Sequence, residues 1–224
     1  MTYPNAHNGL KKLLTAEILS IVAGFLLLVT GVFTAVSAAL AEKNAVPETV
    51  QAVLGIVGLV LLIVFSAIGI LTVVLKILGL KKASTDDPAF RTAFIAALIS
   101  LALSVFEMTL NALSRASVAR IFTTAISILD IVIIIFVIQG IQNLAEQLDN
   151  EKMVKAGQVL MILIAIAYGF KALTMLFPVF FFNAPDFLSR ITASCEIMSA
   201  LASMVGGILY IVYLIRAIRM LKNS

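Results

Sequence analysis

Cysteine and histidine are almost absent from this chain, and their scarcity excludes chemistry that depends on them. The one cysteine, Cys195, excludes an internal disulfide and any metal or redox motif built on two cysteines. The one histidine, His7, lies in a polar N-terminal tail that we expect to be disordered. The sequence also lacks a phosphate-binding loop, HExxH, GxSxG and an acidic metal-binding pair in a loop. We therefore expect no metal, no cofactor and no enzymatic activity.

Charged residues are scarce as well. They make up 12% of the 224 residues, whereas hydrophobic residues make up 62%. Soluble domains are about a quarter charged and about half apolar, so this composition indicates a membrane protein. The formal net charge of +4 does not indicate nucleic-acid binding, because the basic residues flank apolar runs and do not gather into one stripe. The lipid bilayer, most simply the plasma membrane, is the expected surrounding.

Six apolar runs are long enough to cross a bilayer, which takes about 20 residues in a helix. None of them alternates apolar and polar residues, so strands are not expected. The connectors are too short for a separate soluble domain, so the sequence predicts an all-α integral membrane protein with one multi-pass domain over 1–224. Asp87-Pro88 is typical of a helix start, with proline at the first helical position. The predicted spans cover residues 13–40, 50–80, 89–113, 121–142, 154–177 and 191–214.

The first apolar run admits a second interpretation, a cleaved signal peptide. It begins at Lys11-Lys12 and ends in "SAALAE", where Ala39-Leu40-Ala41 fits a small-residue cleavage site. The run is longer than the core of a typical signal peptide, and Glu17 lies near its start. We therefore expect the run to be retained as the first span.

The distribution of lysine and arginine predicts the orientation of the spans. With the N-terminus inside, eleven of these residues fall in inner segments and four in outer segments. Basic residues are enriched on the cytoplasmic side of membrane proteins, so we expect both termini in the cytoplasm.

A weak repeat predicts how the spans are grouped. "LLTAEILS" at 13–20, "FRTAFIAA" at 90–97 and "MVKAGQVL" at 153–160 each open an outward-going span. "ILGL" at 77–80, "IQGI" at 138–141 and "IRAI" at 215–218 each close an inward-going span. The same order recurs three times, which is typical of repeated supersecondary units. We expect three helical hairpins arranged as parallel repeats.

Polar residues inside the predicted spans are the candidates for function. On a helix, Ser100, Ser104, Glu107, Asn111 and Arg115 share one face of the third span. A charge that faces lipid at depth costs about 3 kcal/mol on insertion scales, so we expect these residues to face other helices. Four ionisable residues lie in the outer halves of their spans, and they are Glu107, Asp130, Lys171 and Glu196.

Two functions fit this outer polar cluster. In the first, the residues are interhelical contacts of an accessory or oligomeric membrane component, with Lys171 neutralised by Glu196 or Asp130. In the second, they form the site of a transporter-like or ligand-binding or ion-binding protein. The candidate ligand-binding residues are Glu107, Asn111, Asp130, Lys171 and Glu196, and the candidate rim residues are Arg115, Arg120 and Arg190.

Two further features point to partners. Small residues recur on one face of several spans, which lets helices approach closely and favours packing within the chain or with other membrane proteins or a second copy. They are Gly24 and Gly31, then Gly55, Gly58, Ser66 and Gly69, and then Cys195, Ser199, Ser203 and Gly207. The connector "FPVFFFNAPDF" at 177–187 is expected to be an interfacial loop, a lid over the polar cluster or a docking patch.

Overall fold

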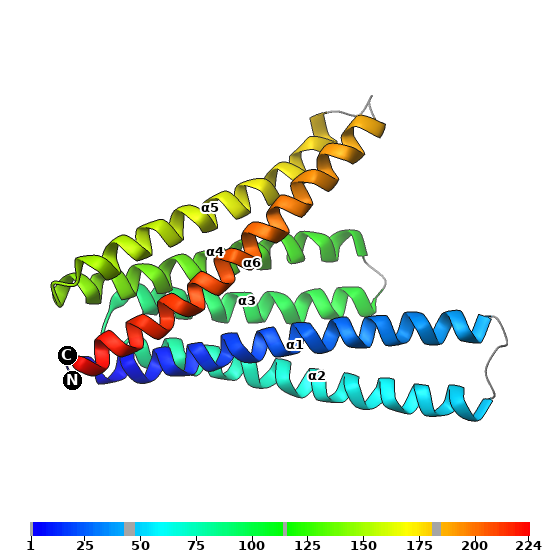
Figure 1. Ribbon diagram of the computed structural model, residues 1–224, viewed down its shortest axis with the longest axis horizontal. Coiled ribbons are helices and arrows are strands. Elements are labelled where there is room, and N and C mark those ends of the chain that lie inside the picture. The colour runs from blue at the N-terminus through cyan, green and yellow to red at the C-terminus, as the bar shows by residue number, and fades with distance from the viewer. Residues whose placement is uncertain (1, 43–47, 114–115, 181–184) are drawn as a thin grey trace. The chain divides into compact units, whose positions relative to one another are not determined.

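In the computed structural model, the described residues are 2–42, 48–113, 116–180 and 185–224, and they form six α-helices (Figure 1). Within the helices, side chains are described except at 36–42, 48–49, 51–52, 54, 116–117, 120, 170–180, 185–193 and 196. The helices are α1 (Pro4–Glu42), α2 (Glu48–Ala83), α3 (Pro88–Ala112), α4 (Ala116–Gln147), α5 (Glu151–Phe180) and α6 (Pro185–Asn223).

Each of the six apolar runs forms a helix, as predicted. Each contains a segment long and apolar enough to cross a membrane. Apart from α3, which has the predicted length of 25 residues, the helices are longer than the predicted spans, because hydropathy marks only the apolar part and backbone hydrogen bonding continues into the polar ends. The prediction that the N-terminal tail is disordered is wrong for this reason. His7 lies in the first turns of α1 and is only 5% exposed.

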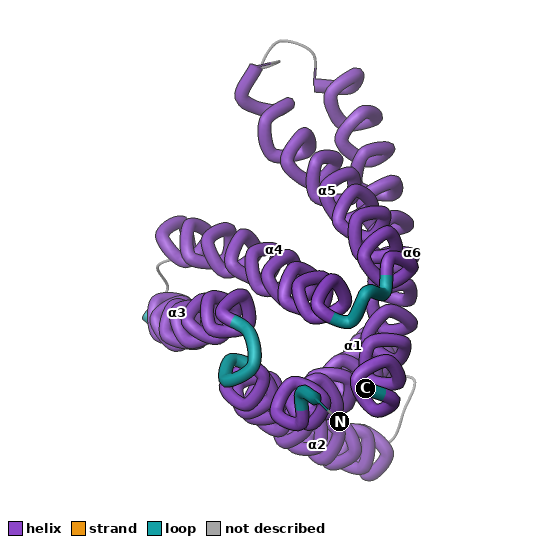
Figure 2. The backbone as a smooth tube through the Cα atoms, turned by 90° about the vertical axis from the view of Figure 1, so that its left-hand side faces the viewer, coloured by secondary structure: helices purple, strands orange, loops and turns teal. Residues whose placement is uncertain are grey.

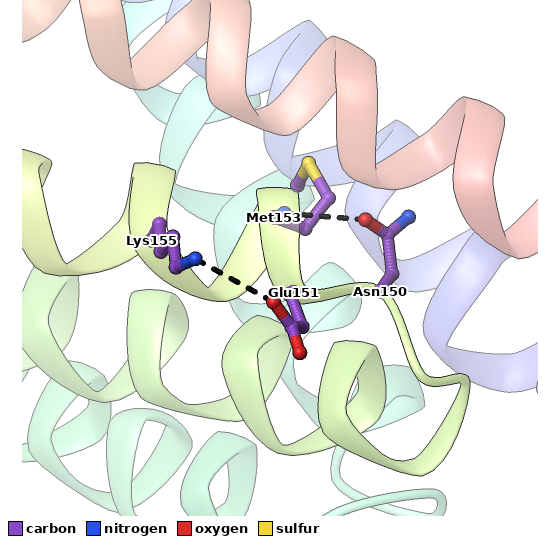
Figure 3. Close-up of polar contacts among 4 residues, drawn as sticks. All are labelled: Asn150, Glu151, Met153 and Lys155. Atoms are coloured by element: carbon purple, nitrogen blue, oxygen red, sulfur yellow. Dashed lines mark hydrogen bonds and ion pairs between the residues drawn. The ribbon is translucent and has the colours of Figure 1, made fainter.

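Two caps define where helices begin at the short connectors. The Asp87 side chain accepts a hydrogen bond from the Ala89 backbone N–H at 2.8 Å, and Pro88 is the first residue of α3, which confirms the predicted helix start. At the connector before α5, the side chain of Asn150 accepts from the Met153 backbone N–H at 3.2 Å (Figure 3). Both side chains satisfy backbone donors that have no partner within the helix.

The helices pair as hairpins along the chain, α1 with α2, α3 with α4, and α5 with α6. Figure 2 shows α3 beside α4 and α5 beside α6, and α4 also contacts α5. The chain divides into two compact units. Unit 1 comprises Met1–Leu10 and Leu80–Ser224, and unit 2 comprises Lys11–Gly79, which is most of the α1–α2 hairpin.

The core of unit 1 lies toward the end that holds both termini, which we call the terminal end. The Thr2 hydroxyl donates to the Ser224 carbonyl oxygen at 3.2 Å, so the second and the last residue of the chain meet there. The buried residues of α3 lie in its first half, between Ala89 and Ser100, and those of α4 lie mostly in its second half. Among the side chains that are fully buried at this end are Phe90, Val137, Ile138, Ile141, Leu144, Leu214 and Leu221.

Polar contacts join the first residues of the chain to the connectors at the terminal end. The carboxylate of Asp86 accepts from the Asn5 side chain at 3.0 Å and from the Ala6 backbone N–H at 2.7 Å. The Tyr3 hydroxyl donates to Gln147 at 2.5 Å. The start of α1 is therefore held by the connector that precedes α3 and by the last residue of α4.

Close packing in unit 1 occurs at glycines other than those predicted. A Cβ on Gly140 would lie 2.9 Å from the ring of Phe90, so α4 approaches α3 where only glycine fits. By contrast, a Cβ would have nothing within 4 Å at Gly24, Gly31, Gly55, Gly58, Gly69 or Gly207. Packing of these glycines against another membrane protein or a second copy therefore stays a prediction. The spacing of residues along a helix reveals a small-residue face, but it does not show what covers that face.

The shared position of the two termini leads to a topology prediction. In a chain with Cys195→Ser, the single variants Ser84→Cys and Ser224→Cys should resist a membrane-impermeant maleimide in intact cells and react after lysis. Asn44→Cys, in a predicted outer connector, should react in intact cells. If the first two variants react in intact cells and the third does not, the orientation is the reverse of the one that the basic residues predict.

Candidate functional site

Glu107 contacts the neighbouring helix of its hairpin. The hydroxyl of Thr123 on α4 donates to Oε1 of Glu107 on α3 at 2.5 Å. The preceding residues, Phe106 and Phe122, stack with their ring centroids 6.4 Å apart. Consecutive residues of α3 therefore meet consecutive residues of α4, one pair polar and one aromatic. The prediction that Glu107 faces another helix holds at this pair.

The rest of the predicted stripe on α3 is not uniformly buried. Ser100 is buried, and the Ser104 hydroxyl donates to the Ser100 carbonyl oxygen within the helix at 2.9 Å. Asn111 is exposed, so the expectation that the whole stripe is the buried side of α3 is wrong at that residue. The reason is the position of the core, which lies near the start of α3, whereas Asn111 lies near its end.

A further polar contact links two other helices of unit 1. Asp130 on α4 is half-buried. The buried Ser199 on α6 donates to the Ala167 carbonyl oxygen on α5 at 3.2 Å. Ser199 thus joins α6 to α5, in agreement with its predicted place on a packing face.

The other candidate residues are not described in enough detail to test their roles. Arg115 lies outside the described residues, and so do the side chains of Arg120, Lys171, Arg190 and Glu196. The pairing of Lys171 with Glu196 or Asp130 therefore stays a prediction. The phenylalanine-rich connector at 177–187 also falls on residues whose side chains are not described.

A polar group of residues at the terminal end of unit 1 was not predicted. The Asn143 side chain donates to the Asp87 carboxylate at 3.1 Å, so the residue that caps α3 also contacts α4. The Gln142 side chain donates to the Val154 carbonyl oxygen at 3.1 Å, which links α4 to α5. In the sequence, these contacts were indicated by two neighbouring amide residues, Gln142 and Asn143, which follow the closing motif of the fourth span.

Gly157, Gln142 and Tyr213 converge where α4, α5 and α6 meet. A Cβ on Gly157 would lie 2.6 Å from the Tyr213 hydroxyl oxygen and 2.7 Å from Nε2 of Gln142. Tyr213 is buried, and its hydroxyl has no hydrogen-bond partner among the described residues. A buried hydroxyl without a hydrogen-bond partner destabilises the folded state. Substitutions at Tyr213 and Gly157 therefore test how tightly the three helices pack.

Two hollows in unit 1 are lined by described residues. One has a volume of about 320 Å³ and lies between α5 and α6, where Lys155 and Arg216 are its charged residues. The other has a volume of about 280 Å³ and lies at the α4–α5 connector, where Glu146, Asp149 and Glu151 accompany Lys155. Among the described residues, no three acids, histidines or cysteines are placed so that they could hold a metal ion.

The helices define a multi-pass membrane protein with six candidate spans. No family model matches the chain, and neither a curated protein nor a solved structure matches it. The function of its sites is therefore argued below from the contacts of its own residues.

Glu107 gives a test of interhelical bonding. Glu107→Gln keeps an oxygen acceptor for Thr123, whereas Glu107→Leu removes it, so only the leucine variant should lower the free energy of unfolding, by about 0.6 to 2 kcal/mol. Unfolding in mixed detergent micelles, followed by circular dichroism, measures this difference. Thr123→Val is the matched control, because it should cost stability in the wild-type chain and not in the Glu107→Leu variant. Equal stability of the two Glu107 variants would mean that the contact contributes nothing.

Tyr213 and Gly157 give a test of helix packing. Tyr213→Phe removes the unpartnered hydroxyl and should raise the free energy of unfolding by about 1 kcal/mol. Gly157→Ala should lower it by about 1 to 3 kcal/mol, because the added methyl group meets Tyr213 and Gln142. Gly207→Ala on α6 is the matched control and should be neutral or stabilising, since nothing lies within 4 Å of the added atom. Destabilisation by Tyr213→Phe would contradict the account of an unpartnered hydroxyl.

Proposed function

We propose that this chain is a non-enzymatic accessory or oligomeric component of the plasma membrane, held together by interhelical polar contacts. The observation that carries the proposal is the hydrogen bond between Thr123 and Glu107, at 2.5 Å. The acid that was the first candidate for ligand binding is engaged by the adjacent helix. An interhelical hydrogen bond is a sufficient reason for a polar residue within a span.

The proposed arrangement places both termini in the cytoplasm and treats the three hairpins as parallel repeats. The pairing of consecutive helices supports the hairpin unit, and the meeting of Thr2 and Ser224 supports an even number of crossings. The basic residues support the cytoplasmic side.

Self-association is supported by the glycine face of α2. Gly55, Gly58 and Gly69 share one side of this helix, and a Cβ at each would have nothing within 4 Å. Exposed large apolar side chains flank them, among them Ile56, Leu59 and Ile70. Small residues on a lipid-facing helix let a second helix approach closely and gain van der Waals contact. A second copy of the chain is therefore the proposed partner of α2.

The transporter-like or ligand-binding alternative stays a prediction. It rests on Asp130, which is half-buried, and on the exposed amide of Asn111. It has less support than the structural role, because Glu107 and Ser199 already make contacts between helices.

The oligomeric role is tested by the mass of the purified full chain in detergent, measured by light scattering. The wild-type chain should form a defined oligomer, and Gly58→Leu with Gly69→Leu should shift it to monomers, because the leucines hold the helices apart. Val60→Leu with Val64→Leu, on the opposite side of α2, is the matched control and should leave the oligomer unchanged. A wild-type chain that is monomeric at every concentration would overturn the proposed self-association.

A further inference from the structure

A groove between α5 and α6 combines two cations with an apolar wall. It has a volume of about 320 Å³. Five of its residues come from α5 and four from α6, and no acid is among these described lining residues. The lining residues are Lys155, Ala156, Val159, Leu160, Leu163, Leu209, Val212, Tyr213 and Arg216.

The two cations lie at the terminal end of the groove. Lys155 is near the start of α5 and Arg216 is near the end of α6, and the two helices are paired antiparallel. Arg216 is exposed and has no ion-pair partner in the described part of the chain. Lys155 lies 3.5 Å from Glu151 in an ion pair whose side chains are 76% and 84% exposed (Figure 3). Such an exposed pair contributes little, so Lys155 can exchange Glu151 for a stronger anion.

The apolar part of the groove has the depth of one membrane leaflet. At a rise of 1.5 Å per residue, Leu163 lies about 12 Å farther along α5 than Lys155. Half of a hydrocarbon core of about 30 Å is about 15 Å. Val159 and Leu209, which line this stretch, are 58% and 40% exposed and give the groove a hydrocarbon wall. A small anion would use only the charged mouth, whereas a lipid would use both parts.

We propose that this groove binds one anionic phospholipid from the leaflet at the terminal end. The phosphate contacts Arg216 and Lys155, and one acyl chain lies along Val159, Leu163 and Leu209. Guanidinium groups bind phosphate oxygens through two parallel hydrogen bonds, and basic pockets between membrane helices bind anionic headgroups. The absence of an acid from the described lining favours an anionic headgroup over a zwitterionic one. This inference does not depend on the accessory or oligomeric role.

The headgroup contact is tested by native mass spectrometry of the full chain in detergent, titrated with phosphatidylglycerol and phosphatidylcholine of the same acyl chains. The wild-type chain should retain one phosphatidylglycerol in preference to phosphatidylcholine. Lys155→Gln with Arg216→Gln should weaken phosphatidylglycerol binding by about 30-fold. Arg91→Gln with Lys222→Gln is the matched control, because it removes the same charge from two exposed residues outside the groove. Equal losses in the two double variants, or equal retention of the two lipids by the wild-type chain, would overturn the proposal.

The acyl-chain contact needs a separate arm. Val159→Phe fills the groove without changing its charge and should weaken phosphatidylglycerol binding at least several-fold, whereas Ile162→Phe, also exposed on α5 but outside the groove, should not. Glycerol phosphate at millimolar concentration should not displace the lipid. Displacement by glycerol phosphate, together with full binding by Val159→Phe, would show an anion site in place of a lipid site and overturn the proposal.

Discussion

Every backbone N–H and C=O group inside hydrocarbon must find its partner within the protein, and the rest of this structure depends on that constraint. Six long helices satisfy it, and the short connectors place neighbouring helices side by side. The donors at helix starts are satisfied by side chains, as at Asp87 and Asn150. These caps lie at the terminal end of unit 1, where the chain enters and leaves its apolar segments and polar side chains are abundant.

The terminal end and the opposite end of unit 1 are built differently. At the terminal end, Gly140 and Gly157 bring helices close together, and side chains such as Phe90 and Tyr213 fill the space between them. Toward the other end, large apolar side chains such as Val105, Phe106 and Met108 are exposed, as suits helices surrounded by lipid. Polar residues there have fewer enclosed neighbours, and this is why Asn111 is exposed while Ser100 is buried.

Polar residues within the spans have at least two uses in this protein. Glu107 and Ser199 bond to neighbouring helices, and each contact offsets part of the cost of placing a polar group away from water. Lys155 and Arg216 instead stay exposed beside an apolar groove, where the headgroup region of a leaflet is their natural surrounding. In this chain, Glu107 and Ser199 thus bond helix to helix, whereas these two long basic side chains remain exposed.

The sequence by itself determined the membrane class and the six candidate spans, because a long apolar run satisfies its own backbone groups in lipid when it is helical. It also determined the start of α3, because Asp87 caps the helix and Pro88 fits its first position. It also pointed to a contact between Glu107 and another helix, since helical periodicity places residues on a face and a charge that faces lipid is costly. Periodicity does not say what covers a face. Only the tertiary structure decided that Gly140 and Gly157 pack closely and that His7 is buried. Those outcomes depend on the positions of other helices, which the spacing of residues along one helix does not contain.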